Sequence, residues 1–304
     1  MRPHAPLPVA LLLVAAGCAG SVRTDRATTP APPTPPASSA GFAVTGAPRA
    51  GEVTADDGVP IAYSLAGTGT PTLLFVHCWG GDRSFWQGAM DSLAATNRVV
   101  AIDLPGHGAS GSSRSAWTVP AFGADVVAVL RALDLREVVL VGHSLGGAVV
   151  LDAAARAPDR VVAVVGVDTL HDVESKDGME ELLAALEQDF VPTCRTFVGS
   201  IFGSAASPEL VSTVQGKLCG ARPEIALPIL RGLAAWDATG ALEAVTIPVR
   251  AIQGDRFPTD LPGNRRHHAD FDVIVLPGTG HFPQLESPED FDRALREVLR
   301  SLRR

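Results

Sequence analysis

The chain has 304 residues, of which 46% are hydrophobic and 19% are charged, and its formal net charge at pH 7 is −8. This length and apolar content are enough to bury a sizeable core, so we expect a globular protein. The negative net charge, with no basic cluster, argues against nucleic acid and against an anionic membrane surface as partners.

The first twenty residues have the layout of a secretory signal. Arg2 gives a positive start, and an apolar run over residues 9–16, too short to span a bilayer stably, leads to small residues before Cys18. This arrangement resembles a bacterial lipoprotein processing site, at which Cys18 would be lipidated. We expect a signal peptide over residues 1–18 and a membrane-anchored lipoprotein in the cell envelope, facing the periplasm or the exterior. An ordinary cleaved signal, giving a secreted protein, is the alternative.

Residues 19–50 are rich in Pro, Thr and Ser and have no hydrophobic period. This composition predicts an extended linker between the anchor and a folded domain over residues 51–304. If Cys18 is processed, Cys194 and Cys219 are left as a possible disulfide in an oxidising compartment, with Cys78 unpaired. Buried free thiols are the alternative reading of these cysteines.

Short apolar runs alternate with helical patterns beyond residue 50. The runs that predict strands buried on both faces are residues 72–76, 98–102, 138–141, 161–167, 249–252 and 273–276. Such strands, separated by amphipathic helices, predict a protein of the α/β class, with a mostly parallel sheet covered by helices on both faces. Residues 52–54 and 61–65, around an Asp-Asp-Gly turn, predict an antiparallel hairpin at the sheet edge.

The alternation of strand and helix patterns is interrupted between residues 167 and 247. The interruption contains helical patterns at residues 180–190 and 208–218, and we predict an inserted helical cap at about residues 171–245. Insertions in such sheets lie at the carboxyl ends of the strands, where ligands bind, so the cap would cover the site. Apolar side chains in this region indicate either a pocket or the cap's own core: Phe190, Phe197, Phe202, Leu210 and Trp236.

The sequence Gly142-His143-Ser144-Leu145-Gly146 follows the third apolar run, at residues 138–141, and precedes a helical pattern at 148–157. A serine between glycines at a strand-to-helix turn is typical of a nucleophile elbow, which pushes the hydroxyl out of the sheet. The helix that follows directs free N–H groups toward a developing oxyanion. Ser144 is therefore the candidate nucleophile.

A serine nucleophile needs a histidine base, and the base needs a carboxylate to hold its tautomer. His281 is the best candidate base because it lies on a Gly-rich loop after the last predicted strand. We expect His143 to point away from Ser144, and His267 and His268 to be exposed on a charged segment.

Four motifs in order resemble the α/β-hydrolase-fold serine hydrolases, of the capped, esterase-like or lipase-like kind. They are His77-Cys78-Trp79-Gly80-Gly81, the turn from Asp103 to Ser110, the elbow, and His281-Phe282-Pro283. The resemblance implies that Ser144 is the nucleophile, that His281 is the base, and that the backbone N–H groups of Trp79 and Leu145 form the oxyanion hole. It implies hydrolysis of an ester, thioester or lactone of a small, partly apolar acyl substrate, without a cofactor.

Two positions depart from the family pattern. Cys78 replaces a glycine beside the oxyanion loop, which either narrows the acyl pocket or is merely tolerated. Phe257 occupies the position where the family often carries its acid. We therefore expect the acid to be Asp168, at the end of the strand 161–167, with Asp255 as the alternative. Two weaker candidates are Asp260 and Asp270.

Other functions are compatible with the same residues. Amide hydrolysis, carbon–carbon bond hydrolysis and cofactor-free perhydrolysis would use the same triad, and a non-catalytic ligand-binding role is a further alternative. No group of His, Asp and Glu has the spacing of metal ligands. The oligomeric state is not predicted.

Overall fold

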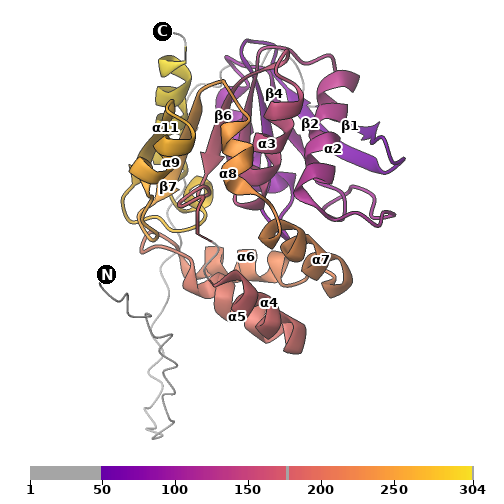
Figure 1. Ribbon diagram of the computed structural model, residues 1–304, viewed down its shortest axis with the longest axis vertical. Coiled ribbons are helices and arrows are strands. Elements are labelled where there is room, and N and C mark those ends of the chain that lie inside the picture. The colour runs from indigo at the N-terminus through magenta and orange to yellow at the C-terminus, as the bar shows by residue number, and fades with distance from the viewer. Residues whose placement is uncertain (1–48, 176–177, 303–304) are drawn as a thin grey trace, which may run out of the picture. The chain divides into compact units, whose positions relative to one another are not determined.

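A computed structural model describes residues 49–175 and 178–302. Its centre is one eight-stranded sheet with the order β1-β2-β4-β3-β5-β6-β7-β8 (Figure 1). The strands are β1 (Arg49–Thr54), β2 (Pro60–Ala66), β3 (Thr72–Val76), β4 (Val99–Ile102), β5 (Val138–His143), β6 (Val161–Val167), β7 (Val249–Gly254) and β8 (Phe271–Leu276).

Strands β1 and β2 form an antiparallel hairpin at one edge, and β2 pairs antiparallel with β4. From β4 onward every neighbouring pair is parallel. Strands β3, β4 and β5 are buried throughout, which their continuous apolar sequences require, because helices cover both faces. The carboxyl ends of β5, β6 and β7 therefore lie side by side at one edge of the sheet.

Helices α2 (Val119–Ala132), α3 (Leu145–Arg156) and α8 (Ala238–Glu243) pack on one face. Helices α1 (Gln87–Leu93) and α11 (Pro288–Ser301) pack on the other, and a large apolar cluster lies on each face. The remaining short elements are a 3-10 helix, η1 (Arg83–Trp86), α9 (Leu261–His267) beside β8, and α10 (Pro283–Glu286).

Four helices between β6 and α8 gather together at one end of the sheet, at the bottom of Figure 1. They are α4 (Met179–Gln188), α5 (Phe190–Ser200), α6 (Pro208–Leu218) and α7 (Pro223–Ala234), and we call them the cap. Cys194 of α5 and Cys219, directly after α6, are joined by a disulfide, while Cys78 is a buried free thiol. No helix within the described residues is both long and apolar enough to cross a membrane.

The predicted fold class is confirmed, and each predicted strand is present. Several boundaries differ by a few residues, and two of them bear on the organisation of the chain. Strand β1 begins at Arg49, where we expected the linker to continue to residue 50, and α3 begins at Leu145, directly after the serine, rather than at residue 148. The predicted signal peptide, Cys18 and the linker up to residue 48 lie outside the described residues.

Candidate active site

The turn from β5 to α3 holds Ser144 in an unusual backbone conformation, with φ 54° and ψ −117°. A non-glycine residue rarely adopts a positive φ, and strain of this kind concentrates at functional sites. A Cβ atom on Gly142 would lie 2.2 Å from the carbonyl oxygen of Gly146, and one on Gly146 would lie 2.4 Å from that of Val76. Both glycines are therefore required for the sharp turn that exposes Ser144 beside the start of α3.

The Ser144 side chain borders two cavities and makes no hydrogen bond to any described residue. His281 borders the smaller of these cavities together with Ser144. Hydrogen bonds between a nucleophile and its base are often long or absent before substrate binds. The arrangement thus leaves the hydroxyl accessible, with a histidine in the same chamber.

His281 lies on the loop after β8, and its Nδ1 is 2.6 Å from Oδ2 of Asp168. The Asp168 side chain is 1% exposed and that of His281 is 19% exposed. Because the carboxylate accepts the Nδ1 proton, Nε2 of the imidazole is left to accept a proton from another group. This is the tautomer that a general base needs.

Asp168 directly follows β6, and two strands supply its partners. Its Oδ1 accepts the backbone N–H of Gly254, at the end of β7, at 3.0 Å, and it lies 3.4 Å from Nε2 of His171. Burial alone would raise the pKa of Asp168, but the interactions with His171 and His281 hold that pKa below its usual value. The carboxyl group is therefore ionised at neutral pH.

The other candidate acids lie away from His281. Asp255 is exposed and accepts the backbone N–H of Gly278 at 2.8 Å. Asp260 caps the N-terminus of α9, and Asp270 pairs with Arg250 at 2.8 Å. Of the four candidates, only Asp168 contacts the imidazole, so the alternative assignment to Asp255 finds no geometric support.

The main chain of His281 is held on both sides. Its N–H donates to the carbonyl of Ile201 at 2.8 Å, and its carbonyl accepts from Nε2 of His143 at 2.6 Å. The amide of Gln284 donates to Nδ1 of His143 at 3.1 Å, which fixes the ring's tautomer. Burial lowers the pKa of His143 to about 3, so this ring is neutral and acts as a fixed donor.

The loop after β3 carries the candidate oxyanion residue Trp79. His77 fixes this loop, because its Nδ1 donates to the carbonyl of Cys78 at 2.7 Å while its Nε2 accepts from Leu104 N at 3.0 Å. Burial lowers the pKa of His77 to about 4. Within the described part of the chain, the backbone N–H groups of Trp79 and Leu145 donate to no other residue, so both can bind a ligand oxygen.

Two cavities meet at Ser144. The smaller has a volume of about 190 Å³ and is mostly apolar; residues that line it include Cys78, Trp79, Phe197, Leu218 and His281. The larger has a volume of about 310 Å³ and includes more polar residues in its lining, among them His171, Asp172 and Ser175; Trp236 also lines it. Phe197 and Trp236 thus line the cavities, whereas Phe202 stacks on Phe282 with ring centroids 4.9 Å apart.

Sequence reasoning missed three parts of this site. His171 follows Asp168 by only three residues, which was a usable signal. The Ile201 carbonyl and the Glu286 carboxylate, which holds the histidine loop, carry no sequence signal because their partners are backbone N–H groups, which residues of almost any type supply. No group of three or more His, Cys, Asp and Glu residues in 49–175 and 178–302 could hold a metal ion.

Comparison with known proteins places these features in context. The family model described as "Alpha/beta hydrolase family" matches residues 73–294. The chain is 30% identical over 249 residues to the dihydrolipoyllysine-residue acetyltransferase component of the acetoin cleaving system of Pseudomonas putida, covering 78% of this chain and 66% of that protein. The chain therefore spans just under two thirds of that relative's length.

Two further proteins resemble the chain over most of their own length. The pimeloyl-[acyl-carrier protein] methyl ester esterase of Chromobacterium violaceum is 29% identical over 245 residues, covering 75% of this chain and 94% of that protein. The malate-bound structure of a thermophilic esterase from Thermogutta terrifontis aligns with a TM-score of 0.73 and 25% identity, covering 84% of this chain and 99% of that one.

Proposed function

The chain belongs to the alpha/beta hydrolase family, and from that premise we propose that it is a serine hydrolase that cleaves an ester or a related activated acyl bond through an acyl-enzyme on Ser144. Esterases among its relatives and structural neighbours support hydrolysis as the reaction type. The observation that carries the proposal is the 2.6 Å contact between His281 and the buried Asp168, beside the serine of a strained elbow.

In the first half of the reaction, Ser144 Oγ attacks the carbonyl carbon of the substrate. Nε2 of His281 accepts the hydroxyl proton, and ionised Asp168 stabilises the imidazolium that forms. The N–H groups of Trp79 and Leu145 bind the negative oxygen of the tetrahedral intermediate. Nε2 of His281 then protonates the leaving group, which departs and leaves the acyl group on Ser144.

In the second half, water takes the place of the leaving group. His281 removes a proton from the water, the hydroxide attacks the acyl carbon, and the same two N–H groups bind the second oxyanion. Collapse of this intermediate returns the proton to Ser144 and releases a carboxylic acid. The residues are unchanged at the end of the cycle, and no other reactant is needed.

The two cavities support a substrate made of two unequal parts. We assign the acyl group to the apolar cavity of about 190 Å³, which is smaller than a typical small-molecule pocket. We assign the leaving group to the cavity of about 310 Å³, which contains His171 and Asp172. The favoured substrate therefore has a short apolar acyl chain and a larger, more polar leaving group.

A series of p-nitrophenyl esters of increasing acyl length tests this proposal, with the full-length protein measured beside Ser144→Ala. We expect hydrolysis of the short esters, a decline in kcat/KM beyond a few acyl carbons, and loss of all activity in the variant. A folded protein that hydrolyses no ester, and whose Ser144 does not react with a fluorophosphonate, would contradict the proposal and favour a ligand-binding role. Activity restricted to amides, carbon–carbon bonds or peracid formation would assign the triad to those reactions instead.

We further propose that the protein is exported and anchored in the cell envelope through a lipid on Cys18. The disulfide between Cys194 and Cys219 supports an oxidising compartment. Mass spectrometry of the protein purified from membranes should find a diacylglyceryl group on Cys18, and Cys18→Ser should release the protein from the membrane fraction. A mature chain that begins elsewhere and carries no lipid would contradict the anchor.

A further inference from the structure

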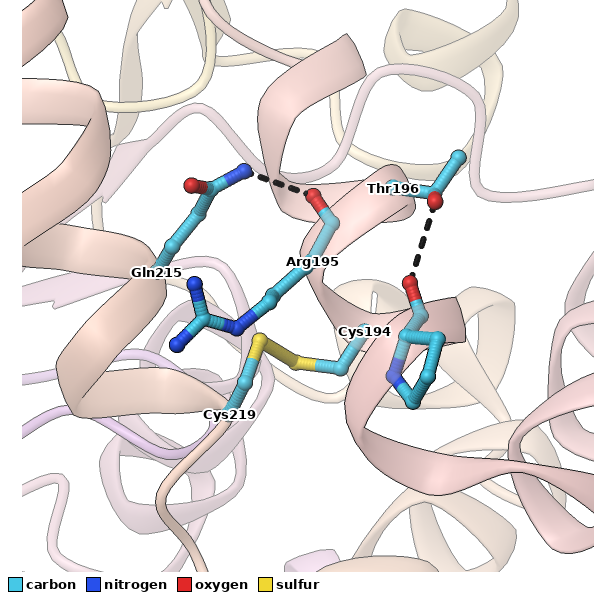
Figure 2. Close-up of a disulfide and its surroundings, with 6 residues drawn as sticks. Cys194, Arg195, Thr196, Gln215 and Cys219 are labelled. Atoms are coloured by element: carbon cyan, nitrogen blue, oxygen red, sulfur yellow. Dashed lines mark hydrogen bonds between the residues drawn. A yellow bond between two sulfur atoms is a disulfide. The ribbon is translucent and has the colours of Figure 1, made fainter.

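The disulfide lies within a pair of cap helices that borders the candidate active site. Figure 2 shows Cys194 of α5 bonded to Cys219 at the end of α6. Beside it, the Gln215 side chain donates to the Arg195 carbonyl at 2.8 Å, so α5 and α6 are joined twice at the same level (Figure 2). The two helices therefore behave as one unit.

The end of α5 holds the loop of the candidate base. Ile201, which directly follows α5, accepts the backbone N–H of His281 at 2.8 Å. Two residues later, the N–H of Gly203 donates to Glu286 at 2.8 Å. A displacement of α5 would therefore also move the main chain of His281.

Glu286 connects the same cap segment to both neighbours of His281. Its Oε2 accepts the N–H groups of Gly203 and Gly280, at 2.8 and 2.9 Å, and its Oε1 accepts that of Phe282 at 2.9 Å. The Glu286 carboxylate is buried, so these three charge-assisted bonds are little weakened by water. Together they fix the histidine loop against the segment that follows α5.

The end of α6 holds the loop of the candidate oxyanion hole. Nζ of Lys217 donates to Ser84 Oγ at 2.8 Å and also pairs with Asp82. A Cβ on Gly80 would be 3.1 Å from the Leu218 backbone, so the loop and the helix end are in close contact. Lys217 and Leu218 are the two residues that precede the disulfide cysteine Cys219.

From these contacts we propose that the Cys194–Cys219 disulfide is a positioning element of the active site, which holds the His281 loop and the Trp79 loop in register with each other. One helix of the pair contacts the base, the other contacts the oxyanion loop, and the disulfide joins the two. This inference rests on the proposed serine hydrolase function. Neither cysteine touches the reacting atoms, so both act through the residues that they position.

The test compares the full-length protein with Cys194→Ser/Cys219→Ser. Glu187→Gln is the matched control, because Glu187 pairs with Arg231 within the cap but contacts neither catalytic loop. At a temperature well below unfolding, we expect kcat of the double variant to fall at least tenfold with KM changed less than threefold. The control should keep kcat within twofold.

The pH profile separates positioning from a general loss of structure. With His281 displaced from Asp168, the carboxylate stabilises the charged imidazole less, and the acid limb of kcat/KM should move to lower pH in the double variant. Glu286→Gln should move that limb in the same direction. Lys217→Met keeps the disulfide and loosens only the oxyanion loop, so it should lower kcat without moving the limb.

Reduction of the wild-type protein gives the same test if the double variant does not fold. A dithiol transfers two electrons and two protons to the disulfide, which yields two cysteine thiols on the protein and a cyclic disulfide of the reagent. Mass spectrometry counts the free thiols on the protein. We expect kcat to fall as Cys194 and Cys219 become free and to return on reoxidation. An active enzyme that keeps kcat and the acid limb without the disulfide would overturn the inference. A wild-type protein with no Ser144-dependent hydrolysis would instead overturn the proposed function and the inference with it.

Discussion

The Asp168 carboxylate has a different partner for each oxygen. Oδ2 accepts the imidazole proton of His281 and Oδ1 accepts the backbone N–H of Gly254, so the carboxylate cannot rotate without losing both bonds. Asp168 itself adopts a positive φ of 42°, which turns its side chain out at the end of β6. Both features fix the direction in which the imidazole points.

Replacing Asp168 by Asn should lower kcat by a factor of about 10³ to 10⁴, because an amide can present an N–H to the ring and favour the wrong tautomer. Asp255→Asn is the matched control, since Asp255 is exposed and its side chain bonds only the Gly278 backbone among the described residues. It should keep kcat within about threefold. Steady-state kinetics on a short ester checks both variants, and the opposite ranking would assign the acid to Asp255.

At the scale of elements, the elbow depends on the close approach of β5, α3 and β3. Gly142→Ala places a Cβ 2.2 Å from a backbone oxygen, which no side-chain rotation can relieve. We expect this change to lower the free energy of unfolding by at least about 3 kcal/mol and to abolish activity. Urea denaturation and ester hydrolysis measure the two effects.

Gly88→Ala in α1 is the control for that substitution. A Cβ at Gly88 meets nothing within 4 Å, and alanine favours a helix more than glycine does. It should raise the free energy of unfolding by about 0.5 to 1 kcal/mol and leave kcat unchanged. Equal tolerance of both alanines would contradict the tight packing of the elbow.

The strands and the elbow were predictable because their signals are local. The sequence of a buried parallel strand is a continuous apolar run, and a strained turn between glycines has a short recognisable motif, as at Ser144. The start of α3 at Leu145 was missed because Gly146 and Gly147 disfavour a helix on propensity alone. Tertiary packing overrides that propensity. A Cβ at Gly147 would lie 2.2 Å from the Thr169 side chain, so the close approach of the helix to this residue requires glycine there.

The same contrast applies to the candidate site. Ser144, His281 and Asp168 lie at strand ends, so topology alone brings them to one edge of the sheet. One partner of the histidine loop, the Ile201 carbonyl, comes from the segment that directly follows cap helix α5, whose packing no sequence pattern specifies. His268 shows the limit of prediction from local sequence. Its charged neighbours predicted an exposed side chain, but only 9% of the residue is exposed in the structure.

At the scale of the molecule, three of the buried histidines among the described residues have strongly lowered pKa values and are neutral. Burial lowers the pKa of His77 to about 4 and that of His107 and His143 to about 3. Well above pH 6.5 these rings are neutral in both the folded and the unfolded chain and contribute nothing to the pH dependence. Below pH 6.5 the unfolded chain binds protons that the folded protein does not, so stability falls as the pH falls.

His107→Asn isolates one of these contributions. The wild-type free energy of unfolding should decline as the pH falls from 6.5 to 4.5, and the variant's decline should be shallower, by a difference that approaches about 1.4 kcal/mol per pH unit in the lower half of that range. Urea denaturation of both proteins across that range measures the difference, in which the other titrating groups cancel. Parallel curves would show that His107 binds protons in the folded protein as it does in the unfolded chain.

The buried thiol of Cys78 can report local opening of the protein near the active site. The thiol is 2% exposed, burial raises its pKa to about 12, and the other two cysteines in the described part of the chain are bonded to each other. A thiol-specific reagent can therefore modify Cys78 only after it enters the cavity beside Ser144, and a reagent larger than that cavity only in molecules that have transiently opened around it. The rate of that modification would measure, without any introduced label, how often the chamber beside Ser144 opens to solvent.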